Sequence, residues 1–165
     1  MSPDLATFTS VHAAALCWWS ATALALWHGK AAVRARDRGF NTLWCTGCLL
    51  LWMHVIAATL LVHEGQWSAA WEHTAQETEA AVGVRTGVGV WFNLLTLIVW
   101  SVDCVRRVSL RRTPDRPATL AERLGDGYLA FMWFQAAVVF PHGAIRFIAG
   151  AATLVLIVIC LVRRV

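Results

Sequence analysis

The sequence predicts an all-α integral membrane protein: a single domain over residues 1–165 with five transmembrane helices, the N-terminus outside, the C-terminus inside, and one amphipathic helix in an outer loop. Three observations carry this prediction. Hydrophobic residues make up 58% of the 165 residues and charged residues only 15%. The apolar residues come in runs of about 20, the helix length that crosses a bilayer. Basic residues gather in three segments, and a bundle of five membrane-spanning helices places all three on the same side of the membrane.

Five apolar runs define the predicted membrane-spanning helices, at about 6–27, 42–62, 84–105, 120–140 and 144–162. The fourth apolar run by itself would span only about 21 Å at the rise of a helix. The preceding letters TLAE, Thr119 to Glu122, match a capping box. A helix that begins at Leu120 is about 31 Å long and crosses the membrane. A re-entrant hairpin over 120–162 is the alternative, because it also returns the C-terminus to the inner side.

Positive charge sets the predicted orientation. Twelve of the fourteen Lys and Arg lie in 30–38, 106–123 and 163–164, and such clusters are retained in the cytoplasm. The first ten residues lack the positive charge of a signal peptide, so we expect the first segment to stay as an anchor. The net charge of +4 follows from this topology and gives no reason to invoke nucleic acid. We therefore expect a multi-pass protein whose main partner is the lipid bilayer.

An acidic segment connects the second and third runs on the outer side. Residues 67–79 predict an amphipathic helix, whose apolar stripe suits the membrane interface: Trp67, Ala70, Trp71, Thr74 and Ala75. Closely spaced glycines follow at Gly83, Gly87 and Gly89, where another helix can approach the backbone. We expect this helix to cover the outer end of the bundle as a lid.

The stretch WEHTAQETEAAVGVRTGVGVWFN, residues 71–93, resembles a group of small uncharacterised bacterial membrane proteins that share a His-Thr-Ala acidic helix, spaced glycines and an Asn. This resemblance implies that the protein resides in the bacterial cytoplasmic (inner) membrane. It carries no activity and transfers no functional residue.

Four polar residues from four predicted helices fall at one depth. His12, His54, Asn93 and Gln135 lie about 8 to 13 Å below the outer ends of their segments at the rise of a helix. Polar side chains inside a membrane usually face the bundle interior, because lipid does not solvate them. The sequence therefore predicts a polar, histidine-containing pocket near the outer face.

Haem b is the leading candidate ligand for this pocket. His12 and His54 are the expected axial ligands, and the two amides supply hydrogen bonds around them. His142 and Arg146, just above, suit an anionic group such as a propionate. The alternative is that each histidine only hydrogen-bonds a neighbouring helix.

A transition metal at the outer surface is a second candidate. His63, His73 and Glu77 are metal-ligand types, and the last two are four residues apart on one helical face. The alternative is a solvated acidic helix. Four cysteines near the inner side suit metal or redox chemistry or simply packing: Cys45, Cys48, Cys104 and Cys160.

Three functions follow from these patterns. The leading one is binding of a redox cofactor or metal at the outer side, as a small subunit of a larger membrane system or of a homo-oligomer. The second is a cofactor-free structural or assembly subunit, whose polar layer locks the helices together. The third is a metal-dependent membrane enzyme with an outer-face site. The sequence leaves open whether the protein is an enzyme.

Overall fold

The described part of the computed structural model covers residues 3–28, 38–140 without 110–118, and 144–162, and it is all-helical. The elements in chain order are α1 (Pro3–His28), α3 (Arg38–Ala57) continued by the π-helix η1 (Ala58–Val62), α4 (Trp67–Val82), α5 (Gly89–Ser109), α6 (Leu120–Phe134) continued by the π-helix η2 (Gln135–Val139), and α7 (Ala144–Val162). The predicted all-α class is confirmed.

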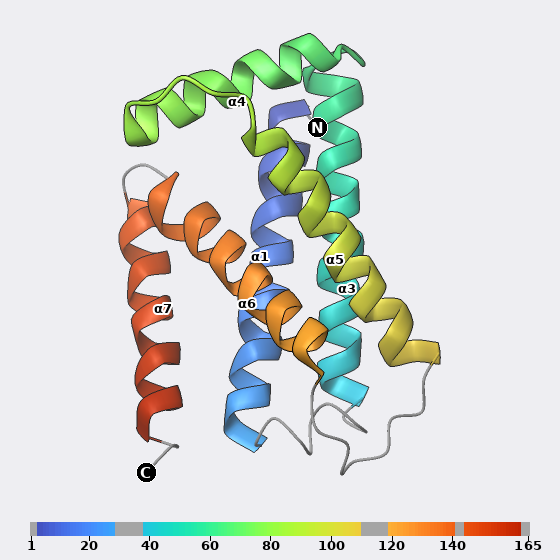
Figure 1. The fold of residues 1–165 in the computed structure, drawn as a ribbon, viewed down its shortest axis with the longest axis vertical. Coiled ribbons are helices and arrows are strands. Elements are labelled where there is room, and N and C mark those ends of the chain that lie inside the picture. The colour runs from blue at the N-terminus through green and yellow to red at the C-terminus, as the bar shows by residue number, and fades with distance from the viewer. Residues whose placement is uncertain (1–2, 29–37, 110–118, 141–143, 163–165) are drawn as a thin grey trace.

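The helices form an up-and-down bundle with one helix across its end (Figure 1). α1 and α3 run antiparallel and make the most extensive helix pair. α5 and α6 slope across in front of them, and α7 packs against η2 and α1 at one edge. α4 lies across the end where α1 begins, and α7 ends at the opposite end of the bundle. The predicted outer helix therefore exists and covers one end of the bundle.

The start of the third predicted helix was wrong by five residues. We expected residue 84, and α5 begins at Gly89. Gly83 adopts a left-handed backbone with φ of 76° and ends α4, and residues 84–88 form the connection. Glycine reaches this conformation without steric cost, which explains why the chain turns here.

The predicted capping box at the start of α6 is confirmed. The Thr119 hydroxyl accepts a hydrogen bond from the Glu122 backbone N–H at 3.3 Å, and the Glu122 carboxylate accepts one from the Thr119 N–H at 2.8 Å. Arg106 of α5 also donates to this carboxylate, whose side chain is only 5% exposed. One acidic residue thus begins α6 and ties it to the end of α5.

Two stretches in the described part of the chain are long and apolar enough to cross a membrane: Arg38–Val62 and α5. Only 17% and 22% of their most apolar windows are buried in the bundle. A core helix of a water-soluble protein can pass the same test, but it is mostly buried. Phe147–Val158 of α7 is a further apolar stretch but is shorter over the described residues. The described residues thus include five long helices of the bundle, whereas five crossings stay a prediction.

Tryptophan rings from four helices build the core. Trp18 stacks on Trp133 at 6.0 Å between ring centroids, Trp133 meets Trp100 edge to face at 5.7 Å, and Trp100 meets Trp44 at 5.5 Å. Such pairs contribute about 0.5–1.5 kcal/mol each beyond the area they bury. None of the four indole N–H groups has a hydrogen-bond partner, so ring packing holds this cluster.

Candidate functional site

The corner between α3 and α4 brings two of the predicted metal ligands together. His63 follows η1, and the next two residues reverse the chain through positive φ angles of 50° at Glu64 and 74° at Gly65. His73 lies on the second turn of α4. The reversal folds α4 back over the end of α3, and the rings of His63 and His73 lie 5.4 Å apart between centroids.

The environment of His63 favours the neutral, ligating form of its imidazole. Its side chain is half-buried, whereas His73 is exposed. Burial lowers the pKa of His63 below its usual value, and the charge of a protonated His73 lowers it further. A metal ion binds imidazole only when the ligating nitrogen is unprotonated. The lowered pKa of His63 therefore favours the form of imidazole that a metal ligand requires.

The third predicted ligand does not complete this pair. Glu77 is exposed and lies one turn beyond His73 on α4. Among the described residues, no three His, Cys, Asp or Glu side chains are arranged to hold one metal ion. The corner therefore offers two imidazole ligands, and the remaining coordination positions of a bound metal ion would have to be filled by other donors.

Aromatic and small residues fasten α4 to the start of α5. The indole ring of Trp71 lies against Gly87, and the Thr74 methyl group lies against Gly89, where an added Cβ would be only 2.9 Å from it. Trp67 packs on Trp91 at 5.4 Å between ring centroids. The predicted apolar stripe of α4 thus faces protein at these positions. The predicted close approach is confirmed at Gly87 and Gly89 but not at Gly83, where no atom lies within 4 Å of an added Cβ.

Arg85 forms ion pairs with α4 that were not predicted from the sequence. Its guanidinium donates to the carboxylates of Glu72 and Glu79, the latter at 2.7 Å. These hydrogen bonds and the two negative charges raise the pKa of Arg85 further. The available signal was a lone basic residue in an acidic outer connection, just past the helix whose charges it neutralises.

The predicted haem ligands His12 and His54 are both anchored on α1. His54 Nδ1 donates to the backbone oxygen of Thr7 at 2.9 Å, and His12 Nδ1 donates to that of Phe8 at 2.7 Å. A carbonyl oxygen only accepts, so Nδ1 carries the proton in both rings. His54 thereby ties α3 to α1, as the alternative interpretation of interhelical hydrogen bonds predicts.

The other predicted members of the polar layer do not gather around these rings. Asn93 is exposed on α5, and Gln135 is half-buried at the start of η2. His142 and the side chain of Arg146 lie outside the described residues. Of the six residues predicted to bind the cofactor, only His12 and His54 are brought together in the described part of the chain. Their rings donate to the carbonyl oxygens of Phe8 and Thr7, which are adjacent residues on α1.

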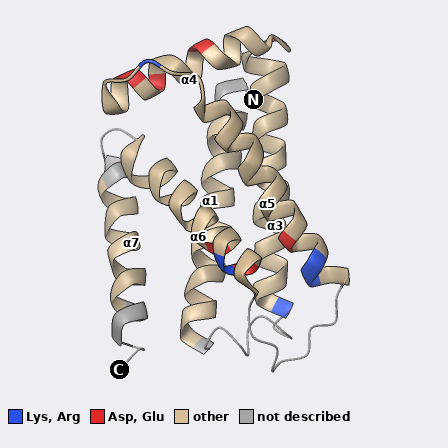
Figure 2. Cartoon of the chain, viewed as in Figure 1, with Lys and Arg blue, Asp and Glu red and all other residues tan. Residues whose placement is uncertain are grey.

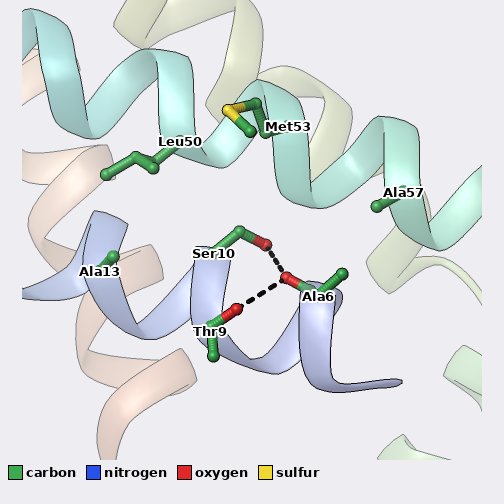
Figure 3. A pocket seen from close by; sticks show the side chains of 7 residues that line it. All are labelled: Ala6, Thr9, Ser10, Ala13, Leu50, Met53 and Ala57. Atoms are coloured by element: carbon green, nitrogen blue, oxygen red, sulfur yellow. Dashed lines mark hydrogen bonds between the residues drawn. The ribbon is translucent and has the colours of Figure 1, made fainter. Parts of the chain in front are cut away.

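A shallow pocket of about 270 Å³ lies between α1 and α3 near the same level (Figure 3). Its walls are Ala6, Thr9, Ser10, Ala13, Leu50, Met53 and Ala57. The hydroxyls of Thr9 and Ser10 donate to the backbone oxygen of Ala6, at 3.2 and 2.7 Å. The surface of this pocket is therefore almost wholly apolar, and neither histidine lines it.

Comparison with known protein families, with curated proteins and with solved structures gives no match to this chain. The function is therefore argued from the geometry of the chain itself.

Proposed function

We propose that this chain is a five-span protein of the bacterial cytoplasmic membrane that binds a transition metal at the outer corner between α3 and α4. His63 and His73 are the protein ligands, and α4 covers that end of the bundle. The protein acts as a small subunit of a larger membrane assembly or of a homo-oligomer. The observation that carries the site is the 5.4 Å separation of the two imidazole rings.

The distribution of charge supports the membrane location. Figure 2 shows the described charged residues in two bands, one along α4 and one around the end of α5 and the start of α6. Arg38 begins α3. Between the bands the helices expose large apolar side chains, such as Leu16 and Met53, which are 68% and 60% exposed. Water does not favour such a surface, whereas the interior of a bilayer does.

The direction of the chain supports five crossings over a re-entrant hairpin. α6 with η2 runs from the lower band to the end near α4, and α7 returns alongside η2 and α1 (Figure 1). With N-out and C-in orientation, the basic segments 30–38, 106–123 and 163–164 then all lie on the cytoplasmic side.

The chemistry of the corner supports a borderline metal such as Zn²⁺ or Cu²⁺. Imidazole nitrogen is a preferred ligand of both ions. Two protein ligands leave coordination positions for water, for Glu77 after a side-chain rotation, or for a donor from a partner subunit. Catalytic metal sites keep an open coordination position. The third function predicted from the sequence, a metal-dependent membrane enzyme, would therefore use this same site.

Metal titration of the full-length protein in detergent tests the proposal. We expect one equivalent of Zn²⁺ or Cu²⁺ to bind by calorimetry and elemental analysis. His63→Ala and His73→Ala should each weaken binding at least about tenfold, equivalent to about 1.4 kcal/mol. His12→Ala is the matched control and should leave the affinity unchanged. Equal affinity in all four proteins would exclude this corner as the site.

A b-type haem at His12 and His54 is the second candidate, and one observation favours it. Histidines that ligate a metal usually donate their other ring N–H to a carbonyl or carboxylate, which orients the ring. Both rings here donate from Nδ1 and keep Nε2 for a ligand. Protein purified from its own membranes should then show a Soret band that His12→Ala and His54→Ala each abolish and His63→Ala does not.

A cofactor-free assembly subunit is the remaining alternative, and the His54–Thr7 hydrogen bond favours it. A colourless, metal-free protein that melts at lower temperature as His54→Ala would support this function. The expected loss is about 0.6 to 2 kcal/mol, the range for interhelical hydrogen bonds in membranes.

A further inference from the structure

Three thiols meet where α3 and α5 pack together, at the end of the bundle opposite α4. Cys45 and Cys48 are three residues apart and share one face of α3. Cys104 of α5 interacts with both of these thiols. Cys48 is buried, whereas Cys45 and Cys104 are half-buried. The structure thus gathers three of the four cysteines that the sequence placed near the inner side, and the side chain of Cys160 lies outside the described residues.

Side chains pack tightly where α3 meets α5 and α1 at this level. A Cβ added at Gly47 would lie 3.0 Å from the ring of Trp100 and 3.0 Å from Cys17 Cβ, so no space is left between α3 and these two side chains. Cys104 Sγ lies 4.0 Å from the backbone oxygen of Trp44. The Cys104 sulfur thus reaches the backbone of α3, and a disulfide between the two helices depends on such an approach, because its two Cα atoms are usually about 4.4–6.8 Å apart.

A hydrogen-bond relay prepares Cys48 as a nucleophile. The indole N–H of Trp52 donates to Ser101 Oγ at 2.9 Å, and this leaves the Ser101 hydroxyl proton free to point to Cys48 Sγ, which is 3.6 Å away. A donor aimed at sulfur stabilises the negative charge of a thiolate, the form of cysteine that attacks another sulfur.

We propose that Cys48 and Cys104 form a reversible disulfide between α3 and α5, with Cys45 as the exchange partner and a lipid-soluble quinone as the oxidant. The disulfide rests on the geometry of the thiols. The choice of a quinone rests on the membrane location proposed above, since a lipid-soluble oxidant reaches half-buried thiols among apolar helices.

The reaction balances as a two-electron exchange. The half-buried Cys104 thiol gives up its proton as its sulfur adds to the quinone, and the Cys48 thiolate then attacks the Cys104 sulfur. The sulfur–sulfur bond forms as the sulfur–quinone bond breaks, and the electron pair stays on the ring. The two protons released by the thiols convert the ring to hydroquinone. Cys45 can next attack the Cys104 sulfur and displace Cys48, which moves the disulfide by one helical turn without a further oxidant.

Peptide mapping of the full-length protein in detergent tests the pairing. The reduced protein is treated without oxygen with duroquinone, a quinone whose fully substituted ring does not retain thiols, and free thiols are then alkylated. Trypsin cleavage after Arg38, Arg85 and Arg106 places Cys45 and Cys48 in peptide 39–85 and Cys104 in peptide 86–106. A disulfide to Cys104 therefore joins two peptides, whereas one between Cys45 and Cys48 stays within one.

We expect the joined peptides and one hydroquinone per chain in the wild type, in Cys45→Ser and in the matched control Cys17→Ser. Cys104→Ser should abolish the joined product. A disulfide found only within peptide 39–85 would overturn the proposal. So would cysteines that all stay free, and are therefore alkylated, even after treatment with the oxidant diamide. If diamide joins the peptides and duroquinone does not, the disulfide stands and the quinone is excluded. The wild-type mapping establishes a disulfide to Cys104 even if a variant misfolds, and Cys45→Ser assigns its partner as Cys48.

Discussion

The five-membered ring of the Trp71 indole lies directly against the backbone of Gly87, with no space between them for a methyl group. Gly87 is buried in the short connection between α4 and α5. This contact holds the second turn of α4 to the connection that precedes α5, and His73 lies on that same turn, two residues after Trp71. The position of the outer helix therefore depends on the absence of a side chain at one residue.

Gly87→Ala should loosen α4. The added methyl group overlaps the Trp71 ring, and overpacking of this kind usually costs about 1–3 kcal/mol. Hydrogen exchange should show faster exchange of the α4 amides, with α1, α3 and α5 still protected. Gly127→Ala is the control, because no atom lies within 4 Å of its added Cβ. Equal protection of α4 in both variants would show that other contacts hold this helix.

A lysine at the middle of α5 distinguishes a lipid-facing surface from a water-facing one. Ile98 is 58% exposed in the middle of that helix. In a bilayer, a lysine there should cost about 2.5–3.5 kcal/mol. An exposed substitution in a water-soluble bundle changes stability by only about 0.5 kcal/mol. Val108→Lys, 75% exposed beside Arg106 and Arg107, is the control, because its charge reaches the interface.

The measurement is thermal unfolding in lipid nanodiscs together with the fraction of each variant that inserts into membranes. Ile98→Lys should unfold earlier and insert less, and Val108→Lys should match the wild type. Two variants that both match the wild type would refute the membrane location of α5.

Glu122→Ala should be more harmful than removal of the cap alone. Glu122 accepts from Arg106 and from the Thr119 N–H, and its side chain is 5% exposed. Removing one partner of a buried ion pair typically costs about 3–5 kcal/mol. The lower end applies here because Arg106 is 29% exposed. Thr119→Ala removes only a cap bond and should cost about 1 kcal/mol. Equal losses in thermal unfolding would mean that the ion pair contributes little.

The sequence predicts the helices well, because their signals are local. The capping box at Thr119 places the start of α6 at the residue observed, and the apolar runs locate the other bundle helices. The start of α5 is the exception. We assigned residues 84–88 to the third predicted helix, yet the backbone adopts a left-handed conformation at Gly83 and turns at Gly87. Apolar composition alone does not distinguish a helix from a turn that packs under another helix.

The candidate site was harder to predict, because it depends on where neighbouring helices lie at each depth. Asn93 and Trp100 belong to one stripe of α5 by spacing. Trp100 is buried because α3 meets α5 there, whereas Asn93, two turns nearer α4, is exposed. His63 and His73 meet because the chain reverses at Glu64 and Gly65. The spacing of possible ligands along the sequence does not predict that reversal.

Acid should weaken the corner between α3 and α4. Burial and the neighbouring His73 lower the pKa of His63 in the folded protein. In the unfolded chain its pKa is about 6.5. Above that pH the imidazole is neutral in both states and pH has no effect through this group. As pH falls through 6.5, the open or unfolded state binds the proton first, and the folded corner loses stability until pH passes the lower, folded pKa.

Hydrogen exchange at pH 7.5 and 5.5 measures this effect, after correction for the intrinsic rates. Amides of η1 and the first turns of α4 should lose protection at the lower pH, and Zn²⁺ affinity should fall over the same range because protons compete for the same nitrogens. His63→Gln, which stays neutral, should remove the pH dependence at this corner, and His12→Gln should not. A pH dependence that persists in His63→Gln would assign the titration to another group and leave His63 without a part in it.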